Sequence, residues 1–154
     1  MNLIYRIILF LLLNFTTLAL GGLFTGKGVS SDWYFNLSKA PWTPPGWVFG
    51  FAWTTIMLCL SVYMAYAWTA VSNHKTLLTL YAIQLLLNFL WNPVFFYLHQ
   101  SALGLLVISC LTALVGFLLV FYWKELGAKS ILILPYFVWL LIATSLNGYI
   151  LLKN

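Results

Sequence analysis

One stretch of this sequence places amide and aromatic side chains at helical spacing within an apolar run. Tyr81, Gln84, Asn88, Trp91 and Phe95 follow one another at steps of 3, 4, 3 and 4, so a helix carries all of them on one face. Amides in hydrocarbon are costly unless they find partners. This face is therefore predicted to point inward, either onto another helix or into a cavity where amides and rings contact a ligand.

The residues needed for acid–base or metal chemistry are scarce. Asp32 and Glu125 are the only acidic residues, and they fall in different predicted loops, so a catalytic carboxylate pair cannot be built. His74 and His99 lie at opposite ends of the same apolar segment, and their spacing gives no zinc or haem ligand set. The sequence thus predicts no metal and no cofactor, and no carboxylate relay for protons within a span.

The composition is that of a polytopic membrane protein. Hydrophobic residues make up 64% and charged residues 6% of the 154 residues, whereas soluble domains carry about 25% charged residues. We expect an all-α bundle that forms a single domain over residues 1–154 and resides in the cell membrane as a multi-pass protein. Runs of about 20 apolar residues predict five spans, at residues 3–24, 46–68, 76–98, 102–123 and 131–152.

The positive charge indicates contact with lipid rather than with nucleic acid. The formal charge of +5 comes from single basic residues scattered along the chain, which argues against a nucleic-acid patch and for attraction to anionic lipid headgroups. With the amino terminus inside, four basic residues are inside and three outside, a small bias for this orientation. They are Arg6, Lys75, Lys124 and Lys129 inside, and Lys27, Lys39 and Lys153 outside.

The segment Trp33–Trp53 interrupts the first two apolar runs. It holds four of the eight tryptophans together with three prolines, so it cannot itself be a span, and we interpret it as a lid or wall. A short interfacial helix is expected at residues 33–39, because Trp and Tyr favour the headgroup level, and a new helix is expected to begin at Pro45. For Trp47, an interface anchor is the alternative to a ligand contact.

The last predicted span repeats the spacing of the third. Tyr136, Trp139, Ala143, Leu146 and Ile150 share one face. Two such faces, with the loop above them, could enclose a flat apolar ligand; the alternative is that the faces only pack on each other. Trp53, nearly two turns inside the second span, fits packing and ligand contact equally well.

Two further features concern the helices themselves. Pro93 removes the backbone bond to Phe89 and is predicted to kink the third span. The fourth span carries the small pairs Ser109/Ala113 and Thr112/Gly116, which are typical of close helix packing or of a dimer contact.

Taken together, these helical faces and the Trp33–Trp53 segment resemble the translocator protein family, also called TspO, tryptophan-rich sensory proteins or peripheral-type benzodiazepine receptors. The resemblance covers nearly the whole chain, although the loop reads Lys39-Ala40-Pro41-Trp42 where the family often has Lys-Pro-x-Trp. The residues that carry it are Trp33-Tyr34, Leu37, Lys39, Trp42, Pro44-Pro45, Trp53-Thr54, Gln84, Leu87-Asn88, Trp91, Pro93, Phe95-Phe96, Gln100, Pro135-Tyr136, Trp139, Ala143-Thr144 and Leu146-Asn147.

The resemblance implies a five-helix bundle, usually a homodimer, with a pocket under the first loop for porphyrins such as protoporphyrin IX and for benzodiazepine-site drugs. The ligand-binding residues it implies are Trp47, Trp53, Gln84, Asn88, Trp91, Trp139, Ala143 and Leu146. The leading hypothesis is thus a membrane receptor or sensory protein.

Two other functions remain open at this stage. The resemblance also suggests light- and oxygen-dependent porphyrin breakdown, in which the oxidisable indoles of Trp53 and Trp139 would be catalytic. Transport of a small amphipathic molecule is the other, although the sequence shows no internal repeat of the kind many transporters have. The family's sterol motif is matched only loosely, by Leu146, Tyr149 and Lys153, so sterol binding is not predicted from it.

Overall fold

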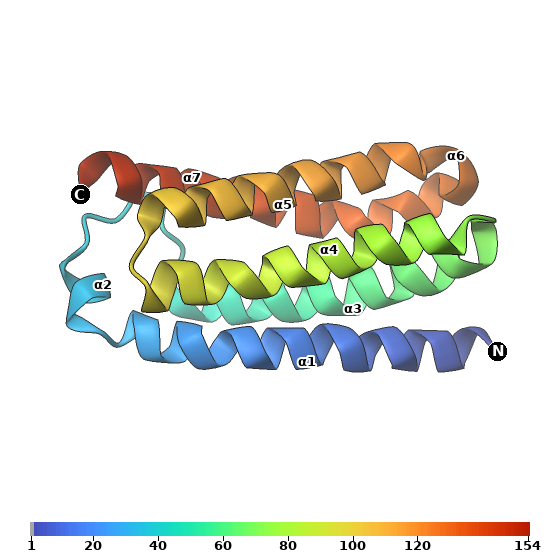
Figure 1. Ribbon diagram of the computed structural model, residues 1–154, viewed down its shortest axis with the longest axis horizontal. Coiled ribbons are helices and arrows are strands. Elements are labelled where there is room, and N and C mark those ends of the chain that lie inside the picture. Colours follow the sequence, from blue (N-terminus) through green and yellow to red (C-terminus); the bar gives the residue numbers. More distant parts are fainter. Residues whose placement is uncertain (1) are drawn as a thin grey trace.

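The computed structural model describes residues 2–154, and five long helices dominate this part of the chain. They lie side by side along the long axis of the molecule (Figure 1). Each of the five corresponding segments is long and apolar enough to cross a membrane, which confirms the predicted bundle and the multi-pass membrane location. The helices are α1 (Leu3–Val29), α3 (Gly46–Ala70), α4 (His74–Asn92), α5 (Ser101–Phe121) and α7 (Leu134–Lys153).

Short elements connect the long helices. The expected interfacial helix is α2 (Asp32–Asn36), which begins where the Ser31 hydroxyl accepts a hydrogen bond from the Tyr34 amide at 3.2 Å, an N-cap that satisfies one free donor. Helix α3 begins directly after Pro45, one residue from the predicted position. Between α5 and α7 lie α6 (Trp123–Leu126) and the 3-10 segment η2 (Gly127–Ile133).

Helix α1 extends five residues beyond the predicted end of the first span, from Phe24 to Val29. Close packing explains the difference. A side chain at Gly21 would meet the Asn92 amide, and one at Gly28 would overlap Phe96, so small residues let this end of α1 approach its neighbours. The Thr25 hydroxyl also donates to Asn92 Oδ1 at 2.6 Å. Tertiary contacts therefore hold a Gly-rich stretch helical that the sequence alone suggests is a loop.

Pro93 changes the type of helix at the end of the third span. Helix α4 stops at Asn92 and continues as a π-helical turn, η1 (Pro93–Tyr97), in which the Leu98 amide donates to the Pro93 carbonyl at 2.9 Å. Proline has no amide hydrogen to continue the α-helical bonds, and the wider turn absorbs one extra residue. As a result two consecutive rings, Phe95 and Phe96, are both buried.

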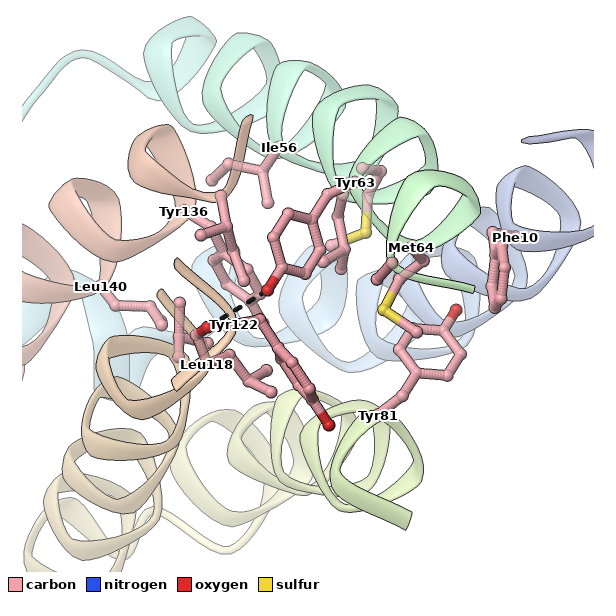
Figure 2. Close-up of a cluster of buried hydrophobic side chains, with 14 of the residues drawn as sticks. Phe10, Ile56, Tyr63, Met64, Tyr81, Leu118, Tyr122, Tyr136 and Leu140 are labelled. Atoms are coloured by element: carbon pink, nitrogen blue, oxygen red, sulfur yellow. Dashed lines mark hydrogen bonds between the residues drawn. The ribbon is translucent and has the colours of Figure 1, made fainter. Parts of the chain in front are cut away.

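Buried aromatic and sulfur-containing side chains fill the bundle near the amino-terminal end of α1 (Figure 2). Phe10 of α1 meets Tyr81 of α4 edge to face, with ring centroids 5.3 Å apart. The Tyr81 hydroxyl donates to Asn14 Oδ1 at 2.7 Å, and Asn14 Nδ2 donates to the Ser61 hydroxyl at 2.8 Å. These hydrogen bonds join α1, α3 and α4, and they give the polar side chains the partners that lipid hydrocarbon does not offer.

One of the two small pairs of α5, Thr112/Gly116, packs inside the chain. A side chain at Gly116 would meet the Phe137 ring, and the hydroxyls of Thr112 and Thr144 lie 3.0 Å apart. Helix α5 therefore packs closely along α7. This accounts for the Thr112/Gly116 pair without a second copy, and the homodimer remains a prediction.

Candidate functional site

The hydroxyl of Tyr136 sits at the centre of the inward-facing polar groups. It accepts hydrogen bonds from Asn88 Nδ2 at 2.7 Å and from Gln84 Nε2 at 2.8 Å. All three residues are buried, and the Trp53 ring lies edge-on to Tyr136 with centroids 6.0 Å apart. Two amides of α4 are thus joined to a phenol of α7, so this layer mainly links helices.

A small hollow lies near this layer, between the wall of α4 and η1 on one side and α7 on the other. Its cavity volume is about 40 Å³. Residues from the α1–α3 connection contribute to it as well. We call this connection the roof, and it lies where the lid or wall was predicted. The lining residues are Tyr34, Lys39, Thr43, Phe49, Trp91, Phe95, Phe96, Ala143, Leu146, Asn147 and Ile150.

One wall of the hollow is held in place by Trp91. Its indole Nε1 donates to Asn147 Oδ1 at 3.1 Å, and its ring stacks on Phe95 with centroids 5.5 Å apart and planes 12° apart. Asn147 Nδ2 in turn donates to the Ser101 carbonyl at 2.9 Å. Because each polar side-chain atom in this series of hydrogen bonds has a partner, the aromatic wall is oriented before any ligand arrives.

Lys39 is the one charged residue among those lining the hollow. Its ammonium lies 4.5 Å from the centroid of the Tyr34 ring and donates to the Phe35 carbonyl at 3.4 Å. Burial raises the pKa of the Tyr34 phenol above its ordinary value of 10.0, so the phenol stays neutral at physiological pH. The aromatic face holds the cation through its quadrupole, and the hollow carries positive charge.

The roof is fastened to α7 through exposed groups. The Ser38 amide donates to Asn154 Oδ1 at 2.8 Å, and Trp42 Nε1 donates to the Ser145 hydroxyl at 3.1 Å. The Trp42 ring also meets Tyr149 edge to face at 5.4 Å. Solvent-exposed bonds of this kind contribute little each, so the part of the connection around Ser38 and Trp42 is held less firmly than the part around Trp33 and Tyr34, whose rings pack on Phe95 and Phe96.

A model of the TspO/MBR family matches residues 8–152. The chain belongs to the TspO/MBR family.

Relatives from all three domains of life support this assignment. The chain is 36% identical over 118 residues to protein CrtK of Rhodobacter capsulatus, covering 75% of this chain and 74% of that protein. It is 36% identical over 135 residues to the tryptophan-rich protein TspO of Archaeoglobus fulgidus, covering 87% of each. Identity to the human translocator protein is 29% over 143 residues, covering 88% of this chain and 85% of that protein.

The structure distributes the predicted site residues of this TspO/MBR chain over four places. Trp91, Ala143 and Leu146 line the hollow. Gln84, Asn88 and Trp53 surround Tyr136. Trp139 is not a lining residue, but its ring lies edge-on to the lining residue Phe49 with centroids 5.3 Å apart, and its buried indole Nε1 lacks a hydrogen-bond partner. Trp47 is 72% exposed and contacts Phe51.

Several lining residues were not among the predicted site residues, and helical spacing could have found some of them. Phe95 follows Trp91 by four positions, and Ile150 follows Leu146 by four, so both share a face with a predicted residue. Phe96 reaches the hollow through the π-helical turn, and Thr43 through the path of the loop. No period in the sequence signals these last two.

Proposed function

We propose that this TspO/MBR protein is a membrane receptor that binds a flat, largely apolar, anionic ligand of the tetrapyrrole class in the hollow beneath the α1–α3 connection. Protoporphyrin IX is the representative ligand, and drugs of the benzodiazepine-site class are competitors for the same space. The observation that carries the proposal is the combination of a pre-oriented Trp91 wall with a single cation, Lys39, in one lining.

The lining suits the two parts of such a ligand. Stacked Trp91 and Phe95 present an aromatic surface to a planar ring, and the small side chain of Ala143 leaves room opposite. A carboxylate on the rim of the ligand would pair with Lys39, which the Tyr34 ring holds in place. Pairing inside a low-dielectric site is stronger than in water.

The hollow must enlarge for this ligand to enter. A volume of about 40 Å³ is far below the roughly 300–1,000 Å³ of sites for drug-sized ligands. The walls belong to helices and the Trp33–Tyr34 part of the roof packs on Phe95 and Phe96, whereas the part around Ser38 and Trp42 is held by exposed bonds. Binding is therefore expected to displace the part of the roof around residues 38–43, with the aromatic wall remaining in place.

The test is a titration of protoporphyrin IX into purified protein, followed by absorbance of the porphyrin. Ala143→Leu fills the hollow and Lys39→Gln removes its charge, and each should weaken binding at least about tenfold. The matched control is Ala82→Phe, which adds bulk at an exposed position of α4 outside the hollow. Equal affinity in all four proteins would reject this site.

Porphyrin breakdown under illumination is the alternative activity, and it requires an oxidisable indole beside the ligand. Trp91 lines the hollow, while Trp53 and Trp139 are not among its lining residues. Illuminating the complex with and without oxygen separates binding from turnover. If porphyrin in the complex breaks down faster than free porphyrin, and if this rate falls in Trp91→Phe, the protein is an enzyme rather than a receptor.

A further inference from the structure

The backbone of His99 adopts a conformation that few side chains tolerate. Its φ is 55°, and within residues 2–154 it is the only residue other than glycine with a positive φ. Gly127 has nearly the same φ, 54°, at a position where a short helix ends and no side chain is present. Histidine tolerates this conformation better than most residues, yet glycine avoids the strain altogether. Because such strain gathers at functional sites, the contacts of the imidazole are informative.

The imidazole of His99 covers one face of the Trp33 indole. The two ring centroids lie 4.2 Å apart and the ring planes are 14° apart, so the flat surfaces of the rings are in contact. Trp33 belongs to α2, whereas His99 lies between η1 and α5, and both segments are at the same end of the bundle (Figure 1). The stack therefore joins the roof to the segment that follows the aromatic wall.

Trp33 in turn contacts residues that line the hollow. Its ring lies edge-on to Phe95 with centroids 5.5 Å apart, and its centroid is 6.5 Å from that of the Tyr34 ring. Phe95 stacks on Trp91 at 5.5 Å, and Tyr34, Phe95 and Trp91 are all lining residues. Trp33 and His99 are not lining residues themselves. Any influence of His99 on a ligand must therefore pass through Trp33 to Tyr34 and Phe95.

A second histidine–tryptophan stack has a local role and provides a comparison. His74 lies on Trp68 with centroids 4.3 Å and planes 5° apart, and His74 Nε2 is 2.9 Å from the Trp68 carbonyl oxygen. This stack closes the connection between α3 and α4, and neither of its residues lines the hollow or has a positive φ. The two stacks have similar ring geometry, so the backbone strain and the contact across the fold distinguish His99.

We propose that His99 is a positioning residue of the ligand site: its ring holds Trp33 against Phe95 and thereby keeps Tyr34 and Phe95 in place along the hollow. A ligand then need not order these side chains when it binds, which strengthens binding. The backbone strain at His99 follows from placing a ring at a position that suits glycine better. The inference rests on the proposed function, because the ligand concerned is the one assigned to the hollow.

The first measurement requires no ligand. The full-length protein is labelled with 5-fluorotryptophan in detergent micelles, and the fluorine resonance of Trp33 is assigned from its absence in Trp33→Phe. His99→Gly removes the ring and should shift this resonance. His99→Asn, which also tolerates a positive φ, should shift it as well. An unchanged Trp33 resonance in both variants would show that the stack does not form and would overturn the proposal.

The second measurement compares the affinity for protoporphyrin IX with the free energy of unfolding. His99→Gly should bind about two- to tenfold more weakly than wild type, as expected when one or two side chains must be ordered on binding. His99→Phe keeps a flat ring and should bind as wild type does. Phenylalanine tolerates a positive φ less well than glycine, so His99→Phe should nevertheless be the less stable of the two variants. A role in folding alone would instead give the weaker affinity to the less stable variant.

His74→Gly is the matched control, because the same substitution removes the other stack. It should keep the Trp33 resonance and the wild-type affinity, and circular dichroism verifies that each variant is folded. If His99→Gly binds as tightly as wild type, or if affinity follows stability in His99→Gly and His99→Phe, then His99 does not position the ligand site and the proposal is overturned. Absence of binding by the wild-type protein would reject the proposed function, whereas the fluorine spectra would still decide whether His99 holds Trp33.

Discussion

Asn88 Nδ2 donates a hydrogen bond of 2.7 Å to the hydroxyl of Tyr136, across the interior between α4 and α7. Gln84 Nε2 donates to the same oxygen at 2.8 Å. One phenol oxygen therefore accepts from the amide nitrogens of two successive turns of α4, whereas the buried Gln84 Oε1 has no hydrogen-bond partner. The faces that the sequence predicted to point inward meet directly at this atom, and the hollow lined by Trp91 lies beside them.

Replacing Tyr136 by phenylalanine should destabilise the bundle by about 1–2 kcal/mol, because two buried donors lose their acceptor at once. The free energy of unfolding in mixed micelles, from a titration with a denaturing detergent, measures the effect. Tyr5→Phe is the control, since Tyr5 is 62% exposed on α1 and its loss should change stability little. Equal stabilities of the two variants would mean that the hydroxyl of Tyr136 does not hold α4 to α7.

The glycines of α1 provide a matched pair for testing helix packing. A Cβ at Gly28 would overlap the Phe96 side chain, whereas a Cβ at Gly22 meets nothing within 4 Å. Gly28→Ala should cost about 1–3 kcal/mol through overpacking, and Gly22→Ala should be neutral or stabilising by about 0.5–1 kcal/mol through helix propensity. The same detergent titration measures both. A stabilising Gly28→Ala would show that α1 does not press against η1.

Much of the fold could be predicted because its cause is local. Apolar runs of spanning length gave all five long helices, and the i, i+3, i+4 spacing of Gln84, Asn88 and Trp91 correctly identified a face that points inward. The extension of α1 to Val29 was missed, since it depends on contacts of Gly28 and Thr25 with residues far along the chain. The π-helical turn after Pro93 was missed for a similar reason, because proline predicts an interruption and leaves its form open.

The candidate site was predicted in outline and differs in detail. Residue type and period could not reveal that Gln84 and Asn88 share one acceptor, Tyr136, while Trp91 binds Asn147 instead. Nor could they reveal the position of Lys39, which is set by the path of the loop. Residues on one helical face can thus belong to different layers, because each layer is defined by the partner on the other helix.

The raised pKa of Tyr34 leads to a prediction for alkaline pH. Burial favours the neutral phenol in the folded protein, so this group contributes stability below its unfolded pKa near 10, and the contribution is lost as pH rises through the higher folded value. Between pH 9 and pH 11, Tyr34→Phe should therefore lose less stability than wild type. Its Tm should fall by about 1 °C or more less than the Tm of wild type over this range. Tyr97→Phe, at a 71% exposed position, should follow wild type throughout.

The bond between Trp42 and Ser145 should control the rate at which ligand enters. Ser145→Ala removes the acceptor of the Trp42 indole hydrogen, and an exposed bond of this kind is worth about 0.5–1.5 kcal/mol. If the roof must detach before binding, the open fraction rises and porphyrin association should accelerate about two- to tenfold. Stopped-flow quenching of tryptophan fluorescence measures this rate.

The control for this experiment is Thr69→Ala, which removes an exposed hydroxyl bonded to the Tyr66 carbonyl of its own helix, near the end of α3. It should leave the association rate unchanged, because it does not touch the roof. Dissociation should accelerate together with association in Ser145→Ala, since ligand leaves by the same opening. An association rate equal to that of wild type would show that ligand reaches the hollow by another route, between the helices, and that the segment carrying Trp42 is a fixed wall.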